Sequence, residues 1–171
     1  MNELSLVMHL LSMKRDSNLI GATKKELIEN LGIKGKNSSV YLQKLIIELS
    51  NYLEPIGLQV RYNPLNSYWF ITFESEISEL FLANPFEGRP SLAATLFCVI
   101  VYCLKSPGNA EIADIQKIRG KKSIIEDIKE LEGLGYLEFI NKSNQVKLTP
   151  LIGYKLDIPK LLLQTALRIK E

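Results

Sequence analysis

The chain has 171 residues, 46% of them hydrophobic, and a formal net charge of +2. This length fits one large domain or two small ones, and the composition is typical of a globular protein with true cores. No apolar run reaches the roughly 18 residues that a membrane span needs, and the N-terminus lacks the basic start and apolar run of a secretory signal. We therefore expect a cytoplasmic protein without membrane contact.

The charge is distributed unevenly along the chain. Residues 1–88 contain 8 Lys and Arg against 10 Asp and Glu, whereas residues 89–171 contain 13 against 9. This asymmetry falls well short of the strong basic stripe of a dedicated DNA-binding protein. Any DNA contact is expected to be weak or indirect.

Side chains that usually carry catalysis or metal binding are scarce. Cys98 and Cys103 lie in one apolar stretch and are expected to be buried, reduced thiols. With His9, which should be buried or at the edge of a helix, they are too few for a zinc site. We find no phosphate-binding loop, nucleophile elbow or carboxylate pair with a matching partner. The sequence therefore predicts no enzyme, no metal and no cofactor.

The first half of the chain begins with two predicted helices. Residues 3–14 carry apolar side chains at helical spacing, and residues 15–18 are a polar break. Thr23 and Glu26 then form a capping box for a second helix, which ends at Gly32.

A longer helix follows, capped by Ser38 or Ser39 and continuing through Leu53. Residues 58–62 alternate apolar and polar side chains, and residues 68–73 are rich in aromatic and β-branched side chains, so both are predicted strands. Three helices followed by a β-hairpin make a winged helix.

The same order of elements recurs in the second half. Ser91 is expected to cap a helix over residues 92–104 that is buried on most sides. After a break, Asn109 is expected to cap a short helix over residues 110–118, which ends at Gly120.

A third helix of the second half is predicted from its caps and its apolar face. Ser123 with Glu126 forms a capping box, and Gly133 and Gly135 supply the positive-φ positions that stop the helix. Residues 136–149 then read as strand, turn and strand. The apolar side of this third helix comprises Ile124, Ile128, Leu131 and Leu134.

We therefore predict an α+β fold that is mostly α: two tandem winged-helix domains with a C-terminal helix. The first domain spans residues 1–83, residues 84–90 are a linker, and the second domain spans residues 91–150. A short helix over residues 76–82 closes the first domain. The remaining residues, 151–171, form a tail.

The tail is predicted to begin irregularly, over residues 150–159, and to end in an apolar helix over residues 160–170. The apolar face of that helix packs either on its own domain or on a partner chain.

Several short motifs follow a recognisable order. The second half has Tyr102 at the end of an apolar helix, then Pro107, Glu111-Ile112 and Ile118-Arg119-Gly120. The first half has Glu26-Leu27, Leu31-Gly32, Gly57-Leu58 and a strand over residues 69–72. This order resembles the ScpB family (segregation and condensation protein B), the tandem winged-helix subunit of prokaryotic SMC–kleisin complexes. The second wing departs from the family pattern, because residues 141–145 contain no arginine.

The resemblance implies a non-enzymatic adaptor. Such a protein binds a kleisin subunit (ScpA-like), and through it helps to regulate an SMC ATPase in chromosome condensation and segregation. It would be a homodimer through its N-terminal domain, and nucleoid-associated in the cytoplasm. The matched positions that would contact the partner are Tyr102, Ile118, Arg119 and Gly120.

Two alternatives share the fold: a DNA-binding transcription regulator, and a module of another assembly, such as a MAGE-type subunit of an SMC complex. The third helix of the first half offers only Lys44 as a base, beside Glu48, and has much apolar surface. The third helix of the second half carries Glu126, Asp127, Glu130 and Glu132 against Lys129. Acidic side chains facing phosphates lower affinity, which argues against a regulator. Possible phosphate contacts are Lys121, Lys122, Lys142 and Lys147, which otherwise are solvated side chains.

Three residues keep two interpretations each. Arg119 either ties its helix to its own wing or to a carboxylate, or binds an acidic kleisin segment through a bidentate pair. Tyr102 lies either at the edge of the core or against a ligand. Trp69 belongs either to the core or to an interface.

Overall fold

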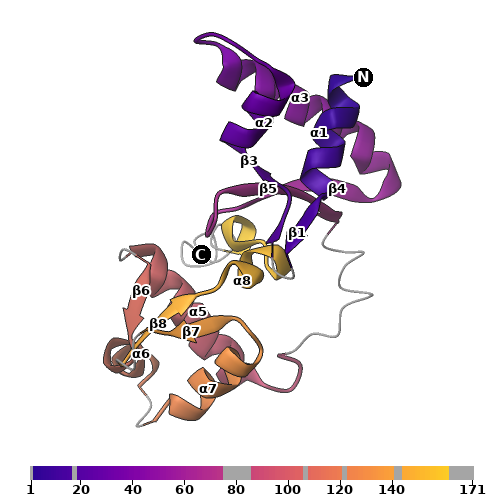
Figure 1. The fold of residues 1–171 in the computed structure, drawn as a ribbon. Helices are drawn as coiled ribbons and strands as arrows, with labels where there is room; N and C mark the ends of the chain where they lie inside the picture. Colours follow the sequence, from indigo (N-terminus) through magenta and orange to yellow (C-terminus); the bar gives the residue numbers. More distant parts are fainter. Residues whose placement is uncertain are drawn as a thin grey trace, which may run out of the picture. The chain divides into compact units, whose positions relative to one another are not determined.

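The computed structural model divides into two compact units, which are described separately. Unit 1 comprises Met1–Ala83 with Leu156–Glu171, and unit 2 comprises Asn84–Lys155. The structure describes residues 2–16, 19–74, 86–105, 108–120, 123–140 and 144–161 (Figure 1).

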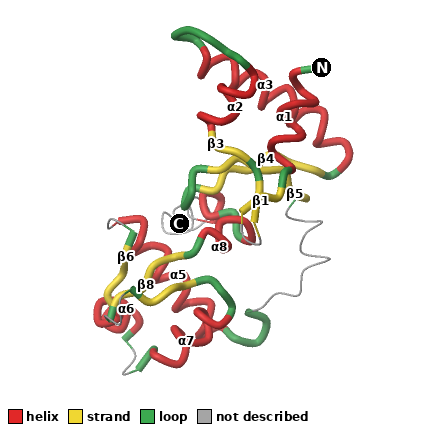
Figure 2. Tube along the Cα trace, viewed as in Figure 1, coloured by secondary structure: helices red, strands yellow, loops and turns green. Residues whose placement is uncertain are grey.

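In the described part of residues 1–74, three helices of unit 1 lie on one side of a small sheet (Figures 1 and 2). They are α1 (Glu3–Ser12), α2 (Lys24–Leu31) and α3 (Ser38–Leu53), and α3 continues into a 3-10 turn, η1 (Glu54–Ile56). Their apolar faces meet in one core, because residues three and four apart share a helix face. This core includes Val7, Leu10, Leu11, Leu27, Leu42, Leu45, Ile46, Leu49 and Leu53.

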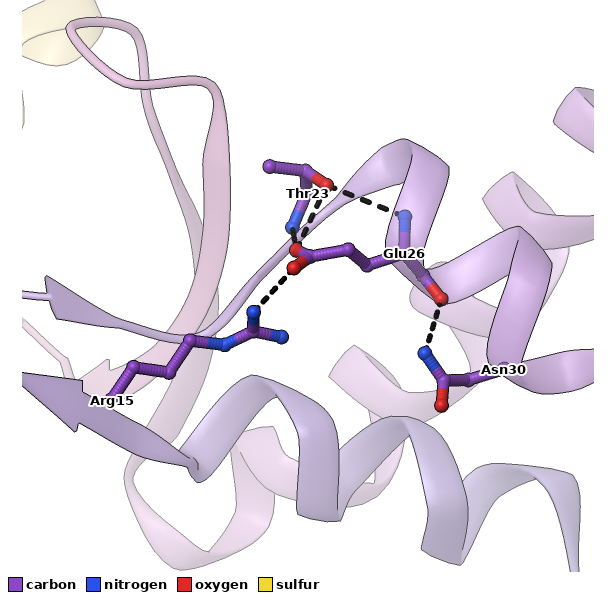
Figure 3. Close-up of polar contacts among 4 residues, drawn as sticks. All are labelled: Arg15, Thr23, Glu26 and Asn30. Carbon is purple, nitrogen blue, oxygen red and sulfur yellow. Dashed lines mark hydrogen bonds and ion pairs between the residues drawn. The ribbon is translucent and has the colours of Figure 1, made fainter.

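The predicted capping box of α2 is confirmed. The Glu26 backbone N–H donates to Thr23 Oγ1 at 3.3 Å, and the Glu26 carboxylate accepts from the Thr23 N–H at 2.8 Å. Arg15 makes an ion pair with the same carboxylate, and Asn30 donates to the Glu26 carbonyl (Figure 3). By contrast, neither expected serine caps α3, which follows Asn37 without a side-chain cap.

The sheet of unit 1 has the strand order β3-β5-β4 and is antiparallel. Strands β4 (Leu58–Asn63) and β5 (Tyr68–Phe73) form the predicted wing, and β3 (Ala22–Thr23) pairs with β5. Gly21 precedes β3 with φ +90°, and a Cβ there would lie 2.0 Å from the Trp69 carbonyl oxygen. Glycine therefore permits the close approach of these two strands.

The expected polar break at residues 15–18 is wrong in part. Lys14–Asp16 form strand β1, which pairs with β2 (Leu19–Ile20). The side chains of β1 are exposed, so polar residues are compatible with this two-stranded hairpin. Polarity alone does not distinguish such a strand from a loop.

Unit 2 repeats the plan. Its helices are α5 (Pro90–Lys105), α6 (Ile112–Arg119), α7 (Ile125–Gly133) and α8 (Pro150–Lys155). Strands β6 (Asn109–Glu111), β8 (Gln145–Leu148) and β7 (Leu137–Phe139) form an antiparallel sheet in that order. The core comprises residues such as Leu96, Val99, Ile100, Ile115, Ile124, Ile128, Leu131, Leu137, Val146 and Ile152. The predicted α+β fold with two winged-helix units is confirmed.

Three predicted helix starts in unit 2 are wrong. Helix α5 begins at Pro90, before Ser91, since proline is well suited to a first helical position. Asn109 is not a cap but pairs with Lys147 in the sheet. The capping box of Ser123 is absent, because the helix begins after Ile124 without a side-chain cap.

Two further expectations about helix ends need correction. Gly133 lies within α7, and only Gly135 has a positive φ, of 77°. Residues 150–155, expected to be irregular, form α8. The expected tail is also divided, since α8 belongs to unit 2 and the chain from Leu156 onward to unit 1.

The predicted helix over residues 76–82, and residues 162–170 of the predicted C-terminal helix, lie outside the described residues. Within the part of the chain that the structure describes, no helix is long and apolar enough to cross a membrane.

Candidate functional site

The four positions that the family resemblance marks lie on two neighbouring helices of unit 2. Tyr102 is on α5, Ile118 and Arg119 end α6, and Gly120 is its C-cap. They differ in exposure, because Tyr102 and Arg119 are half-buried while Gly120 is exposed and Ile118 is 60% exposed. Ile118 is therefore the apolar side chain of this group that is most accessible to a partner.

Tyr102 links α5 to α6. Its hydroxyl donates to Asp114 Oδ2 at 2.6 Å, and Lys117 Nζ lies 3.2 Å from Asp114 Oδ1. The Tyr102 hydrogen bond, followed by the Lys117 contact, holds the pKa of Asp114 below its ordinary value. Tyr102 thus lies at the edge of the core with its hydroxyl engaged.

Arg119 also connects its helix to α5. Its Nε donates to Thr95 Oγ1 at 3.3 Å, and its Nη2 donates to the Ser91 carbonyl at 3.3 Å. These contacts support the structural interpretation of Arg119, although they lead to α5 rather than to the wing.

The same network continues into α7. The fully buried Thr95 hydroxyl donates to Asp127 Oδ2 at 2.7 Å, and the Ser91 hydroxyl reaches the same oxygen at 3.1 Å. Buried polar groups need such partners, so the network fixes α5, α6 and α7 against one another. The sequence offers no local signal for it, because the residues that it joins are 24–36 positions apart in the chain.

The lysines proposed as phosphate contacts are only partly described. Lys147 on β8 makes an ion pair with Glu138 on β7 at 2.9 Å. Lys121, Lys122 and Lys142 lie outside the described residues.

The acidic side chains of α7 are also partly engaged. Asp127 accepts from α5, and Glu130 pairs with Arg89, which directly precedes α5. Both carboxylates thus help to hold α7 in place, and the exposed Glu126 and Glu132 keep its surface acidic.

Unit 1 presents a different surface along α3 and η1, which we call the apolar face. Four of its large hydrophobic side chains are 54–66% exposed, and the bases on α3 are limited to Lys44. The members of the apolar face are Val40 and Ile47, two turns apart on one side of α3, with Tyr52 and Ile56 about a third of a turn or more further round, near its C-terminal end. Exposed apolar residues gathered on one element mark interaction sites more often than isolated ones do.

The sequence predicts apolar surface on this helix without distinguishing the residues that form it. Val40 is apolar like the residues of the inner stripe, yet it is exposed. The spacing carries the signal, since Val40 and Ile47 are seven residues apart and off the stripe of Leu42, Leu45 and Leu49.

The next candidates are the two thiols and the histidine. Cys103 is buried and Cys98 half-buried, and both are free. Burial raises the pKa of Cys103 to about 11, so its reactive thiolate form is disfavoured. His9, expected to be buried or at the helix edge, is exposed on α1. Among the described residues, no group of three or more His, Cys, Asp or Glu is placed to hold a metal ion.

A hollow of about 440 Å³ lies beside α2, lined by Lys24, Lys25, Ile28 and Glu29. It is open to solvent, unlike the enclosed sites that bury a small ligand. The apolar face and Ile118 are therefore the stronger candidates, and both are suited to protein contact.

Two units of three helices and a β-hairpin define a tandem winged-helix protein. No protein-family model and no curated protein matches the chain. Similar solved structures include a conserved hypothetical protein from Chlorobium tepidum, 20% identical with a TM-score of 0.37, which covers 90% of this chain and 96% of that one. They also include ScpB from Mycobacterium tuberculosis, 12% identical with a TM-score of 0.32, which covers 91% of this chain and 96% of that one. Both TM-scores are low, so the fold assignment rests on the chain's own elements.

Proposed function

We propose that this chain is a non-enzymatic adaptor of ScpB type. It binds an ScpA-like kleisin subunit, and through it an SMC ATPase that condenses and segregates chromosomes. The observation that carries the proposal is the apolar face of unit 1, because it lies on the helix that a DNA-binding winged helix inserts into the major groove.

A helix that reads DNA needs donors for base edges and cations for phosphates. Helix α3 instead exposes Val40 and Ile47, and its cation Lys44 stands one turn before Glu48. Covering large exposed apolar side chains with a protein surface lowers the free energy of the complex. This composition supports a protein partner rather than a nucleic acid.

The third helix of unit 2 supports the same conclusion. Helix α7 carries two acidic residues in its first turn, and it exposes Glu126, Glu130 and Glu132. An acidic helix would repel the phosphate backbone.

We assign the apolar face to a second copy of the chain, as the first half of the proposal. In a two-fold symmetric contact the same patch serves both copies. Lys44 and Glu48 lie on α3 beside the apolar face, so each copy offers one charge of either sign. Across the two-fold axis, Lys44 of one copy can then face Glu48 of the other.

The kleisin contact is assigned to the end of α6, around Ile118. Its exposure supports this placement, as do the ties of Tyr102 and Arg119 to neighbouring helices, which make the support rigid. The test is a calorimetric titration of the full chain with a recombinant ScpA-like kleisin.

Ile118→Glu should weaken kleisin binding by about tenfold or more, as expected for an interface anchor. The matched control is Ala113→Glu, which adds the same charge at an exposed position of the same helix. The proposal fails if the wild-type chain binds no kleisin. If kleisin binds and the two variants behave alike, only the placement at Ile118 is wrong.

A further inference from the structure

The outer side of the first wing is partly buried. Strands β4 and β5 alternate sides, and Leu58, Val60, Trp69 and Ile71 pack against the helix core of unit 1. The opposite side carries Phe70, which is only 2% exposed, and its cross-strand neighbour Arg61, whose side chain is 12% exposed. A wing with one free side would leave such residues in water, so something covers them.

The structure places the C-terminal segment of unit 1, residues 156–161, beside Arg61 on this side of the wing. Asp157 Oδ2 lies 3.7 Å from Arg61 Nε, and the Arg61 guanidinium carbon is 5.6 Å from the centre of the Phe70 ring. The next residue, Ile158, is almost fully buried. In this segment an acidic residue, Asp157, is thus followed directly by a buried, branched apolar residue, Ile158.

The conformation of the segment is organised around the same carboxylate. The Lys160 N–H donates to Asp157 Oδ1 at 3.1 Å, and the Leu161 N–H donates to the Asp157 carbonyl at 2.9 Å. Asp157 therefore caps a helical turn with one oxygen and approaches Arg61 with the other. One side chain thus takes part in both the helical turn and the ion pair.

We propose that the outer side of the first wing is a binding surface for an acidic residue followed by a branched apolar one, and that the chain's own residues 156–161 occupy it in cis. The segment thereby withholds this surface from other partners. Any protein or nucleic acid that uses the outer side of this wing must first displace Asp157. This inference stands independently of which partner the chain takes elsewhere.

The charge balance supports the proposal. Arg61 is largely removed from water, and burial lowers its pKa while Asp157 opposes that shift. Removing the carboxylate leaves a buried cation without this partner, which is unfavourable. The pair therefore holds the segment on the wing more firmly than an exposed pair would.

The test is hydroxyl-radical footprinting of the full chain, read by mass spectrometry at Phe70. In Asp157→Lys, like charges face each other, and oxidation of Phe70 should rise by about tenfold, the equivalent of about 1.4 kcal/mol in the docking equilibrium. Tyr62 is the internal reference, because it lies on the other side of β4 and is already partly exposed. Asp157→Asn, which keeps the cap, should give a smaller rise.

Rescue and control variants separate docking from general damage. Arg61→Glu combined with Asp157→Lys restores opposite charges and should return Phe70 oxidation toward the wild-type rate. Glu138→Gln, which breaks an exposed ion pair in unit 2, should change nothing. The proposal is overturned if Phe70 stays protected in Asp157→Lys, or if the charge-swapped double variant is as open as that single variant.

Discussion

Helices α3 and α7 hold the same place in the two units and present different surfaces. Helix α3 buries Leu45 and Leu49 and exposes the apolar face, whereas α7 buries Ile128 and Leu131 and exposes carboxylates. The fold requires an apolar inner stripe and leaves the outer side free to vary. Function must therefore be argued from each outer surface and not from the winged-helix fold.

The largest expected effect tests whether the two inner stripes are equivalent. Leu49→Ala in unit 1 and Leu131→Ala in unit 2 should each lower the free energy of unfolding by about 2–5 kcal/mol, because each leaves a cavity in a packed core. Urea titration followed by the fluorescence of Trp69, the only tryptophan, reports on unit 1. Hydrogen exchange of α7 reports on unit 2. A loss below about 1 kcal/mol in either variant would contradict the equivalence.

A smaller effect distinguishes the two sides of α7: the side that bonds to α5 and the side that is exposed. Asp127→Ala removes the acceptor of the buried Thr95 hydroxyl, and should cost unit 2 about 1–3 kcal/mol of unfolding free energy. The control is Glu126→Ala on the exposed side of α7, expected to stay within about 0.5 kcal/mol of wild type. Equal stabilities in thermal and urea unfolding would show that the network does not hold α7.

The smallest effect compares the second helices, since α2 has a capping box and α6 has no side-chain cap. Burial raises the pKa of Glu26, but the Thr23 hydrogen bonds and Arg15 outweigh it and the pKa falls below 4.5. The folded state thus favours the ionised carboxylate. The contribution of Glu26 to stability is therefore complete above the pKa that it has in the unfolded chain. It is lost as the pH falls through the lower pKa of the folded state.

The measurement is the unfolding free energy of unit 1 between about pH 3 and about pH 7. Glu26→Gln should flatten its decline in acid, whereas Glu29→Gln, on the exposed side of α2, should not. Parallel curves for wild type and Glu26→Gln would argue against the capping box as the acid-sensitive element.

The sequence predicts most elements because periodicity and local caps are short-range signals. The capping box of α2 and the wing of unit 1 follow from neighbouring residues alone. The failures in unit 2 have a different cause. Asn109 is a good cap by type, yet its pairing with Lys147, distant in the chain, makes it a strand residue instead.

The candidate site was less predictable than the fold. The Ile-Arg-Gly motif indicates Ile118 and Arg119 as candidates. Only the packed structure shows that the isoleucine is exposed and that the arginine is hydrogen-bonded to α5. The approach of Asp157 to Arg61 joins residues nearly a hundred positions apart, so no local pattern indicates it. Surface and network residues depend on tertiary contacts, which periodicity does not encode.

The most direct test of the central claim, that the apolar face of α3 contacts protein and not DNA, is the solution mass by light scattering. A DNA titration at several salt concentrations on the same samples completes it. Ile47→Glu disrupts the apolar face, and Ala113→Glu adds the same charge at an exposed position of α6 in unit 2, outside the apolar face.

We predict a wild-type mass of about twice 19.4 kDa, a dimeric Ala113→Glu variant and a monomeric Ile47→Glu variant, with negligible DNA binding at moderate salt in all three. A sequence-selective DNA complex whose affinity falls steeply with salt, and which Ile47→Glu abolishes, would contradict the account and favour a DNA-binding regulator.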